Sequence, residues 1–454
     1  MPTPTDLVTD LPADFEVFGQ AVDSSLADLK GGTTGQVLSK NSNTDMDFVW
    51  VTNAAGDITG VTAGTGISGG GTSGTVTITN SMATEITAKG DLIVGTGSAT
   101  FDNLAIGANG STIVADSAAT TGLRYSATPS ASNPIINSAF QIWQRGTSIA
   151  GSASVSNYTA DRWLGYTAAT STFSRQATGD TTNLPNIQYA MRVQRTAGGT
   201  GTDHFYLTYS QESVNSIPYA GKSVTISFYA RKGANFNDGT AGLSLVVGTG
   251  TGTDQNFLSG YTGSVTALNQ PLTLTTTWTR YSYNLNIGAT ATELGFYFNH
   301  RASATAAGAA DYYEVTGVQI DVGSVALPFR TYAATIQGEL AACQRYYNRF
   351  TAPQAYSHLA QGWAISTDNM TAWFYLPVEM RTVPTAVDWS SVNMGDGVNA
   401  QITPSTITFK ADNNNTKAIA CTGTKSAGGM TQYRGYQFLA AGTTAAYIGF
   451  SAEL

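Results

Sequence analysis

Short runs in which apolar and polar residues alternate fill most of the chain after residue 126. Residues 223–230, 278–285 and 294–298 are examples, and turns rich in Gly, Asn and Asp separate such runs. A period of two is typical of strands that bury one face. About eight to ten strands lie between residues 126 and 332, and their regular spacing predicts an antiparallel β-sandwich of jelly-roll type.

Residues 351–454 again show alternating runs, such as 370–376 and 406–410, with Gly-Gly and Asn-rich turns between them. This region predicts a second, smaller β-sandwich or knob. Apolar side chains at spacings of three and four cover residues 335–350. They predict a helix that leads from the first sandwich into the C-terminal domain.

An earlier helix is predicted at residues 13–30, where Phe15, Phe18, Val22 and Leu29 occupy a and d positions of two heptads. Two heptads are too short for an independent coiled coil. We therefore expect this helix to cap a larger assembly, to insert into a partner protein, or to fold back on its own chain. The predicted fold class is all-β with two short helices.

The segment between this helix and the sandwich is repetitive. Residues 32–50 align without a gap to residues 107–125, matching two glycines, an aliphatic position, an Asn/Asp-Ser pair and a final aliphatic–x–aromatic pattern. Each copy predicts two short strands around a polar turn, and such repetition indicates a modular shaft. Very short strands with single Ile or Val side chains cannot bury a core within one chain. We expect several chains to intertwine, and a homotrimer gives a closed prism.

Composition excludes several classes of function. The chain has 454 residues, which predicts two or three domains, and only 11% of the residues are charged. The net charge is −8 and Lys and Arg form no cluster, so we do not expect nucleic-acid binding. No apolar run approaches the roughly 20 residues of a membrane-spanning helix, and no signal peptide is apparent. We therefore expect no membrane insertion.

The two cysteines, Cys343 and Cys421, lie far apart and fit no Cys-x-x-Cys spacing. We favour two buried, reduced thiols over a disulfide. Assembly in a reducing cytoplasm is the corresponding expectation.

Residues for catalysis are sparse. The three histidines are isolated, so the sequence predicts no metal cluster, catalytic triad or cofactor. Glycoside hydrolysis would need two carboxylates about 5–9 Å apart. Asp311, Glu314 and Asp321 are candidates only by elimination, because they lie in or before a strand whose neighbours resemble core. We expect no enzymatic activity.

Several motifs, taken in order, resemble the lectin-like module of bacteriophage tail fibre proteins. They begin with Asn-Pro-Ile-Ile-Asn-Ser-Ala-Phe-Gln-Ile-Trp-Gln-Arg-Gly at 133–146 and Tyr-Thr-Ala-Asp-Arg-Trp at 158–163. Residues 217–231, 318–329 and 343–347 are similar to the same family, and the repeats resemble its shaft segments. The resemblance covers nearly the whole chain.

This resemblance implies a virion-attached homotrimer, assembled in the host cytoplasm, that contacts the host surface, often through glycans. Similar modules also occur on capsid fibres. We predict a virion-attachment segment at 1–30 that contacts other virion proteins, a β shaft at 31–125, a lectin-like jelly roll at 126–332, and a receptor-binding tip at 333–454. The expected partner is a surface glycan or outer-membrane receptor. The alternatives are a capsid or neck fibre or a spacer with no ligand of its own, and a polysaccharide depolymerase.

A glycan site needs aromatic faces for the C–H surfaces of sugars, together with planar amide, carboxylate or guanidinium groups for their hydroxyls. Loops and faces of a distal domain are natural contact surfaces. The favoured candidates in the C-terminal domain are Trp363, Trp373, Tyr375, Trp389, Tyr433, Arg434 and Tyr436. The secondary candidates, for which a structural role as core or as an internal Asp161–Arg162 ion pair is the stronger interpretation, are Trp143, Arg145, Asp161, Arg162 and Trp163.

Overall fold

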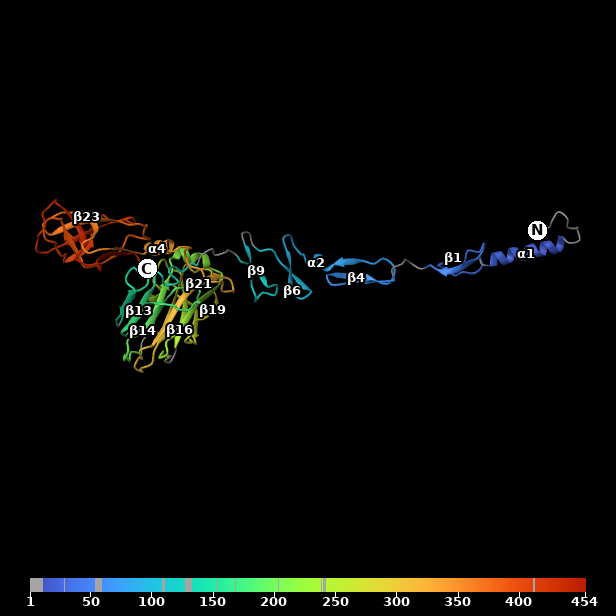
Figure 1. Ribbon diagram of the computed structural model, residues 1–454, viewed down its shortest axis with the longest axis horizontal. Coiled ribbons are helices and arrows are strands. Elements are labelled where there is room, and N and C mark those ends of the chain that lie inside the picture. Colours follow the sequence, from blue (N-terminus) through green and yellow to red (C-terminus); the bar gives the residue numbers. More distant parts are fainter. Residues whose placement is uncertain are drawn as a thin grey trace. The chain divides into compact units, whose positions relative to one another are not determined.

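The computed structural model confirms an all-β fold with few short helices (Figure 1). It describes residues 11–27, 29–53, 59–107, 111–126, 133–152, 154–167, 169–202, 204–237, 239, 242–410 and 413–454. Residues 1–10 of the predicted attachment segment and residues 108–110 of the second repeat lie outside these described residues. The chain divides into two compact units, the first formed by Met1–Ala108 with Ile113–Tyr125 and the second by Asn109–Thr112 with Ser126–Leu454.

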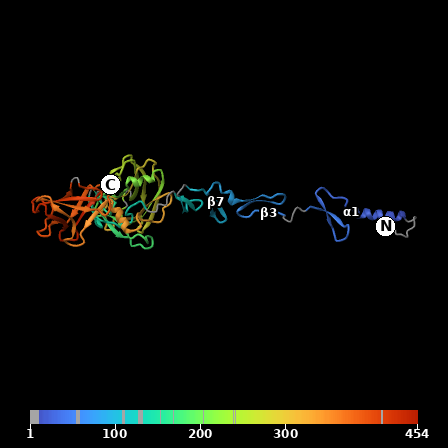
Figure 2. The same ribbon diagram turned by 90° about the horizontal axis from the view of Figure 1, so that it is seen from above.

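The first unit consists of a helix and small antiparallel sheets whose strands pair with their neighbours in sequence (Figure 2). Helix α1 (Leu11–Ala27) overlaps the predicted helix at 13–30 but ends before Leu29, which lies in a turn. The sheets are β1–β2 (Gln36–Lys40, Phe48–Thr52), β3–β4–β5 (Val61–Thr62, Ile67–Gly71, Ile78–Asn80), β6–β7 (Leu92–Gly97, Thr100–Leu104) and β8–β9 (Thr112–Ala115, Leu123–Ser126), with the one-turn helix α2 (Ser81–Thr84) after β5.

Both copies of the sequence repeat form a two-stranded hairpin, as predicted. The first glycine of each copy lies under the aromatic residue that ends it. A Cβ atom added to Gly32 would lie 2.7 Å from the Trp50 ring, and one added to Gly107 would lie 2.4 Å from Tyr125. Glycine recurs there because any side chain would displace the aromatic ring. No helix within the described ranges is long and apolar enough to span a membrane.

The second unit opens with a sandwich of two six-stranded antiparallel sheets. In sheet order, the first contains β10 (Ser148–Gly151), β13 (Ser171–Ala177), β14 (Tyr189–Arg195), β21 (Tyr312–Val322), β16 (Ser223–Lys232) and β19 (Thr279–Asn286). The other contains β11 (Val155–Tyr158), β12 (Leu164–Thr167), β15 (His204–Ser210), β20 (Glu293–Arg301), β17 (Leu243–Gly250) and β18 (Val265–Leu272). Short helices α3 (Ser213–Ser216), η1 (Ile217–Tyr219) and η2 (Phe257–Ser259) lie in the connections. Alternate residues of the two sheets, including Phe205, Phe228 and Phe296, form one buried core, as expected for a jelly roll.

The C-terminal part of this unit follows helix α4 (Ile336–Gln344) and contains two more antiparallel sheets. Three strands, β22 (Tyr347–Thr351), β30 (Tyr447–Ser451) and β25 (Ala386–Ser390), form the smaller sheet. The larger sheet has the order β26 (Val392–Gly395), β29 (Gly435–Ala440), β23 (His358–Ala364), β24 (Asn369–Tyr375), β28 (Ala418–Thr424) and β27 (Thr406–Phe409). Met370, Phe374, Ile419 and Phe438 belong to the core that this domain buries.

The prediction of a continuous helix over 335–350 is wrong at its C-terminal end. The helix begins after Thr335, whose side chain accepts a hydrogen bond from the Gly338 N–H, and it ends at Gln344. Strand β22 then pairs in register with β30. Tyr347 and Phe350 continue the helical spacing in sequence, but pairing with a strand about a hundred residues later determines their conformation.

Both cysteines are buried and free, as the favoured interpretation predicted. Cys343 packs beside Ile136, Ile142 and Tyr346, whereas Cys421 lies in the core of the C-terminal domain. Burial raises the pKa of the Cys343 thiol well above its usual value and that of Cys421 to about 12. Both thiols therefore behave as small apolar core groups rather than as nucleophiles.

Candidate functional site

The hairpin of β23 and β24 presents large aromatic side chains on the outer face of the six-stranded sheet. Along β24, Met370, Ala372 and Phe374 are buried, while the intervening Trp373 and Tyr375 point away from the core. In β23 the outward positions are Gln361 and Trp363. Strand alternation thus turns the apolar core inward and leaves an aromatic surface outside.

The two outward tryptophans stack on one another. Gln361 lies opposite Trp373 and Trp363 lies opposite Thr371 in the β23–β24 register, so the two indoles are diagonal neighbours. Their ring centroids are 4.7 Å apart with an interplanar angle of 27°. Such contacts are typical of diagonal cross-strand pairs with large rings.

A cleft of about 490 Å³ is lined by Gln361, Trp363, Trp373 and Tyr375. Trp363 is 44% exposed and Tyr375 is 77% exposed. The Lys410 Nζ atom lies 5.9 Å from the centroid of the Trp373 ring. Three aromatic side chains around one exposed amide provide flat apolar surface together with a donor and an acceptor, the combination that ligand sites use.

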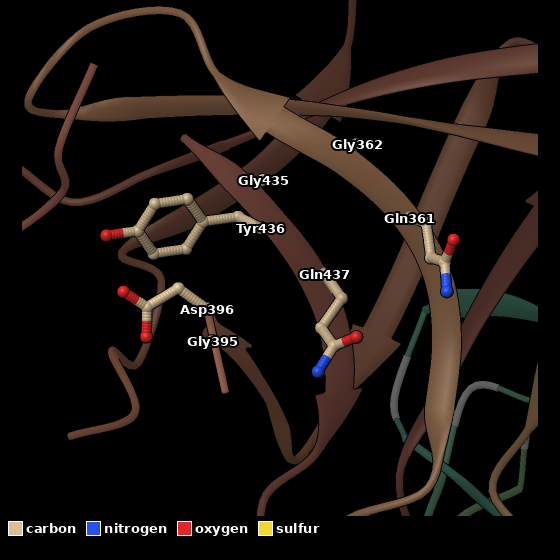
Figure 3. Close-up of a pocket in the computed structure, with 7 residues that line it drawn as sticks. All are labelled: Gln361, Gly362, Gly395, Asp396, Gly435, Tyr436 and Gln437. Atoms are coloured by element: carbon tan, nitrogen blue, oxygen red, sulfur yellow. The ribbon is translucent and has the colours of Figure 1, made fainter. Parts of the chain in front are cut away.

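A smaller pocket of about 180 Å³ lies on the same sheet beside this cleft, and Gln361 lines both (Figure 3). Asp396, Tyr436 and Gln437 provide its other polar groups. Glycines from three strands complete its wall: Gly362, Gly395 and Gly435. The pocket is therefore polar, in contrast to the aromatic cleft.

Asp396 is held as a carboxylate by several donors. Its side chain accepts hydrogen bonds from the Val398 and Asn399 N–H groups at 3.0 and 2.8 Å and pairs with Arg434 Nε at 3.1 Å. Burial alone would raise the pKa of Asp396, but these hydrogen bonds and the Arg434 charge outweigh it and lower the pKa. The opposite charges of this pair largely cancel, and the Arg434 side chain is 36% exposed whereas that of Asp396 is only 1% exposed.

The remaining C-terminal candidates are dispersed. Trp389, in β25, is partly buried against the domain core. Tyr433 is 80% exposed in the loop before β29, but it lines neither hollow. Tyr436 is buried, and its hydroxyl accepts a hydrogen bond from the Thr431 N–H at 3.2 Å. The structure thus brings Trp363, Trp373 and Tyr375 together and keeps Trp389 and Tyr433 apart from them.

Burial removes the secondary candidates from any exposed surface. Trp143, Asp161, Arg162 and Trp163 are each at most 8% exposed, and the Arg145 side chain is 13% exposed. Trp163 is a core residue, and its ring centroid lies 4.7 Å from that of Phe140. This burial favours the structural interpretation of these residues over a role in ligand binding.

The expected Asp161–Arg162 ion pair is also wrong in its partners. Arg162 pairs with Glu453 and donates from Nη2 to the Ser210 carbonyl at 2.7 Å. Asp161 lies 3.8 Å from Arg145 and accepts a hydrogen bond of 2.6 Å from Gln144 Nε2. Burial raises the pKa of Asp161 to about 6, although the Arg145 charge opposes this shift.

These buried charges lie where the sandwich meets the C-terminal domain. Arg145 stacks on Tyr347 at 3.5 Å from the ring centroid, and Arg162 stacks on Tyr346 at 3.6 Å. Glu453 bridges the two arginines, since its other oxygen lies 3.4 Å from Arg145 Nη1. The motif at 133–163 is thus a structural junction within the second unit.

The acids considered for hydrolysis are each paired with arginine. Asp311 lies 2.7 Å from Arg195, and Asp321 lies 2.6 Å from Arg330. Glu314 pairs with Arg192 at 2.6 Å and also with Arg231. All three carboxylates are buried, and their pairing with arginines favours structural roles for them. Within the described ranges, no cluster of three or more His, Cys, Asp or Glu residues could hold a metal ion.

Sequence reasoning missed Gln361, Asp396 and Gln437. Gln361 alternates with Trp363 along β23, so its face was predictable once that strand was recognised. Its position opposite Trp373 depends on the hairpin register. Asp396 and Gln437 come from distant parts of the sequence and meet only in the folded sheet.

The sequence matches no protein-family model, and a search of curated proteins finds no match. Solved structures give partial similarities. The enzymatically active domain of tailspike protein 4 of bacteriophage CBA120 aligns with 42% of this chain and 21% of its own, with 12% identity and a TM-score of 0.27. A CBM22-1 xylan-binding domain of Paenibacillus barcinonensis aligns with 39% of this chain and 98% of its own, with 14% identity and a TM-score of 0.23. An adhesin domain of the Lys-gingipain of Porphyromonas gingivalis aligns with 40% of this chain and 100% of its own, with 14% identity and a TM-score of 0.23.

Proposed function

We propose that this protein is a homotrimeric fibre of a bacteriophage virion that binds a glycan on the host cell surface. The glycan binds on the outer face of the C-terminal sheet. Trp363 and Trp373 stack against the sugar rings, and Gln361 and Tyr375 hydrogen-bond to sugar hydroxyls. The protein acts by binding and does not cleave the glycan.

The observation that carries this proposal is the exposed aromatic cleft. Single exposed apolar residues are common on protein surfaces and need no explanation. Here two stacked indoles and a tyrosine gather around one amide on the outer face of the sheet. Aromatic planes with a few polar groups at their edges fit sugars, which have an apolar C–H face and a rim of hydroxyls.

The proposal of a trimer is supported by apolar side chains that the first unit leaves exposed. Aliphatic residues in and beside its strands are between 37% and 55% exposed, although each unit of a stable shaft needs a covered core. They are Val37, Val49, Val51, Ile67, Ile78, Leu92, Ile106 and Ile113. Helix α1 likewise exposes Phe15, Phe18 and Val22. Identical rows from three chains would cover one another, and three linked sites would raise avidity.

We expect multi-angle light scattering of the full chain to give three times the 47.4 kDa mass of one chain. Ile78→Asp should shift the mass toward that of a monomer, because Ile78 is 55% exposed in one chain and would be buried among three. The replacement should leave the second unit folded, as judged by its thermal transition. A stable monomer of the unaltered chain would contradict the trimer.

Adsorption to bacteria tests the proposed function directly. We expect purified full-length protein, added to the bacteria before the phage, to occupy the receptor and reduce phage adsorption. The same preparation should release no reducing sugar ends from host polysaccharide. Phage adsorption that is not reduced would contradict receptor binding. Steady release of reducing sugar ends would show that the protein depolymerises the polysaccharide.

A further inference from the structure

The aromatic cleft continues into the polar pocket along one row of the sheet. Gly395 lies opposite Gln437, Gln437 opposite Gln361, and Gln361 opposite Trp373. Directly opposed residues of an antiparallel sheet point to the same face. Four adjacent strands, from β26 through β29 and β23 to β24, therefore contribute to one continuous outer surface.

No side chain separates the two hollows in the next row. Trp363 lies opposite Gly435, on the strand between the aromatic cleft and Asp396. A Cβ atom built on Gly435 would meet nothing within 4 Å. Figure 3 shows Gln437 between Asp396 on one side and Gln361 on the other, with Gly435 on the same strand. The glycine leaves the floor open between the stacked indoles and the Asp396–Arg434 pair.

The two ends of this surface differ in chemistry. The aromatic end offers ring faces for apolar C–H groups. Two amides follow, Gln361 and Gln437, and the far end holds the Asp396–Arg434 pair, whose opposite charges largely cancel. This order of groups along the surface suits a long ligand that is rich in hydroxyls and carries no net charge. One end of the ligand would contact aromatic rings and the other end would contact polar groups.

We infer that the aromatic cleft and the polar pocket form one groove that binds an uncharged oligosaccharide of two or more sugar units. One unit stacks on Trp363 and Trp373, and the chain then crosses Gly435 and reaches the guanidinium of Arg434, because the paired Asp396 side chain is only 1% exposed. Three gaps of about 4.8 Å separate β24 from β26, so the groove spans roughly 14 Å, longer than one sugar ring. This inference rests on the proposed function and adds the minimum length and the direction of the glycan.

The test fills the floor of the groove at Gly435, beside the aromatic cleft and opposite Trp363. Gly435→Val is compatible with the fold, because the position lies in a strand, has no left-handed φ, and has open space around the added side chain. Gly288→Val is the matched control, since Gly288 has the same open surroundings and lies in the jelly roll after β19. The probes are neutral surface polysaccharide from the host bacteria and its short and long fragments after partial hydrolysis.

We expect the affinity of the unaltered full chain to rise at least tenfold from single sugars to longer fragments, as measured by titration calorimetry. Gly435→Val should abolish this rise and leave the weak binding of single sugars unchanged, and Gly288→Val should have no effect. If Gly435→Val fails to fold, Gln437→Ala should lower binding of the longer fragments only.

Two results would overturn the extended groove. One is an affinity that does not increase with fragment length, and the other is wild-type binding of long fragments by Gly435→Val. If the proposed function itself is wrong, the result with Trp363→Ala is different. This variant would then bind fragments of every length with the same affinity as the unaltered chain. Loss of binding in Trp363→Ala with normal binding in Gly435→Val would keep the aromatic site and reject the groove.

Discussion

Replacement of Trp363 and Trp373 together by alanine is expected to reduce the affinity for the host surface by at least about 30-fold per site. Central aromatic residues of binding sites commonly contribute about 2 kcal/mol or more each, and a loss of about 2 kcal/mol already corresponds to roughly 30-fold in Kd. The two rings form one stacked surface, so each single replacement should have a large effect as well. Titration of the purified variants with host surface polysaccharide measures this loss.

Both tryptophans point away from the core, so the double variant should fold normally. Tyr356→Ala serves as the control, because Tyr356 is 60% exposed and does not line the cleft. Trp363→Phe keeps a flat ring and should retain part of the affinity. Unchanged binding by the double variant, with Tyr356→Ala equally unaffected, would move the site away from this face.

Glu453→Gln is expected to destabilise the second unit by about 3–5 kcal/mol, the usual cost of leaving a buried charge without its partner. The Glu453 and Arg162 side chains are only 3% and 1% exposed. Glutamine preserves the size of the side chain but removes the charge that compensates both Arg162 and Arg145. Denaturant unfolding, followed by the fluorescence of the buried tryptophans, gives the change in midpoint.

The matched control is Glu379→Gln. Glu379 also pairs with a cation, Lys417 at 3.5 Å, but the two side chains are 54% and 72% exposed. Exposed pairs contribute little to stability, so this variant should unfold at the unaltered midpoint. Equal midpoints for Glu453→Gln and Glu379→Gln would show that the buried junction does not stabilise the fold.

Sequence patterns predicted the fold class, since alternation along single strands is a local property. The same alternation placed Trp373 and Tyr375 on the outward face of a strand that buries Met370 and Phe374. The composition of the cleft was less predictable, because the position of Gln361 against Trp373 depends on register.

Burial was harder to predict than strand position. The sequence favoured a structural role for Arg145, Asp161 and Arg162, but no local pattern reveals which groups cover them and pair with them. Glu453, which pairs with both arginines, lies 291 residues after Arg162 in the sequence. Arginine and aspartate are exposed in most contexts, and only the packing of the C-terminal domain against the sandwich places these residues inside.

The end of helix α4 has a similar cause. Tyr347 and Phe350 extend the helical period, but strand β30 pairs with their backbone. A local pattern cannot indicate a partner strand that lies a hundred residues later. Long-range pairing therefore decides both the end of this helix and the composition of the candidate site.

A crystal structure of the protein with a bound fragment of host surface polysaccharide tests the central claim most directly. We expect density for a sugar ring against the indoles of Trp363 and Trp373, with Gln361 in contact with its hydroxyls. Density for the fragment on the jelly roll, or on any surface other than this face of the C-terminal sheet, would contradict the claim.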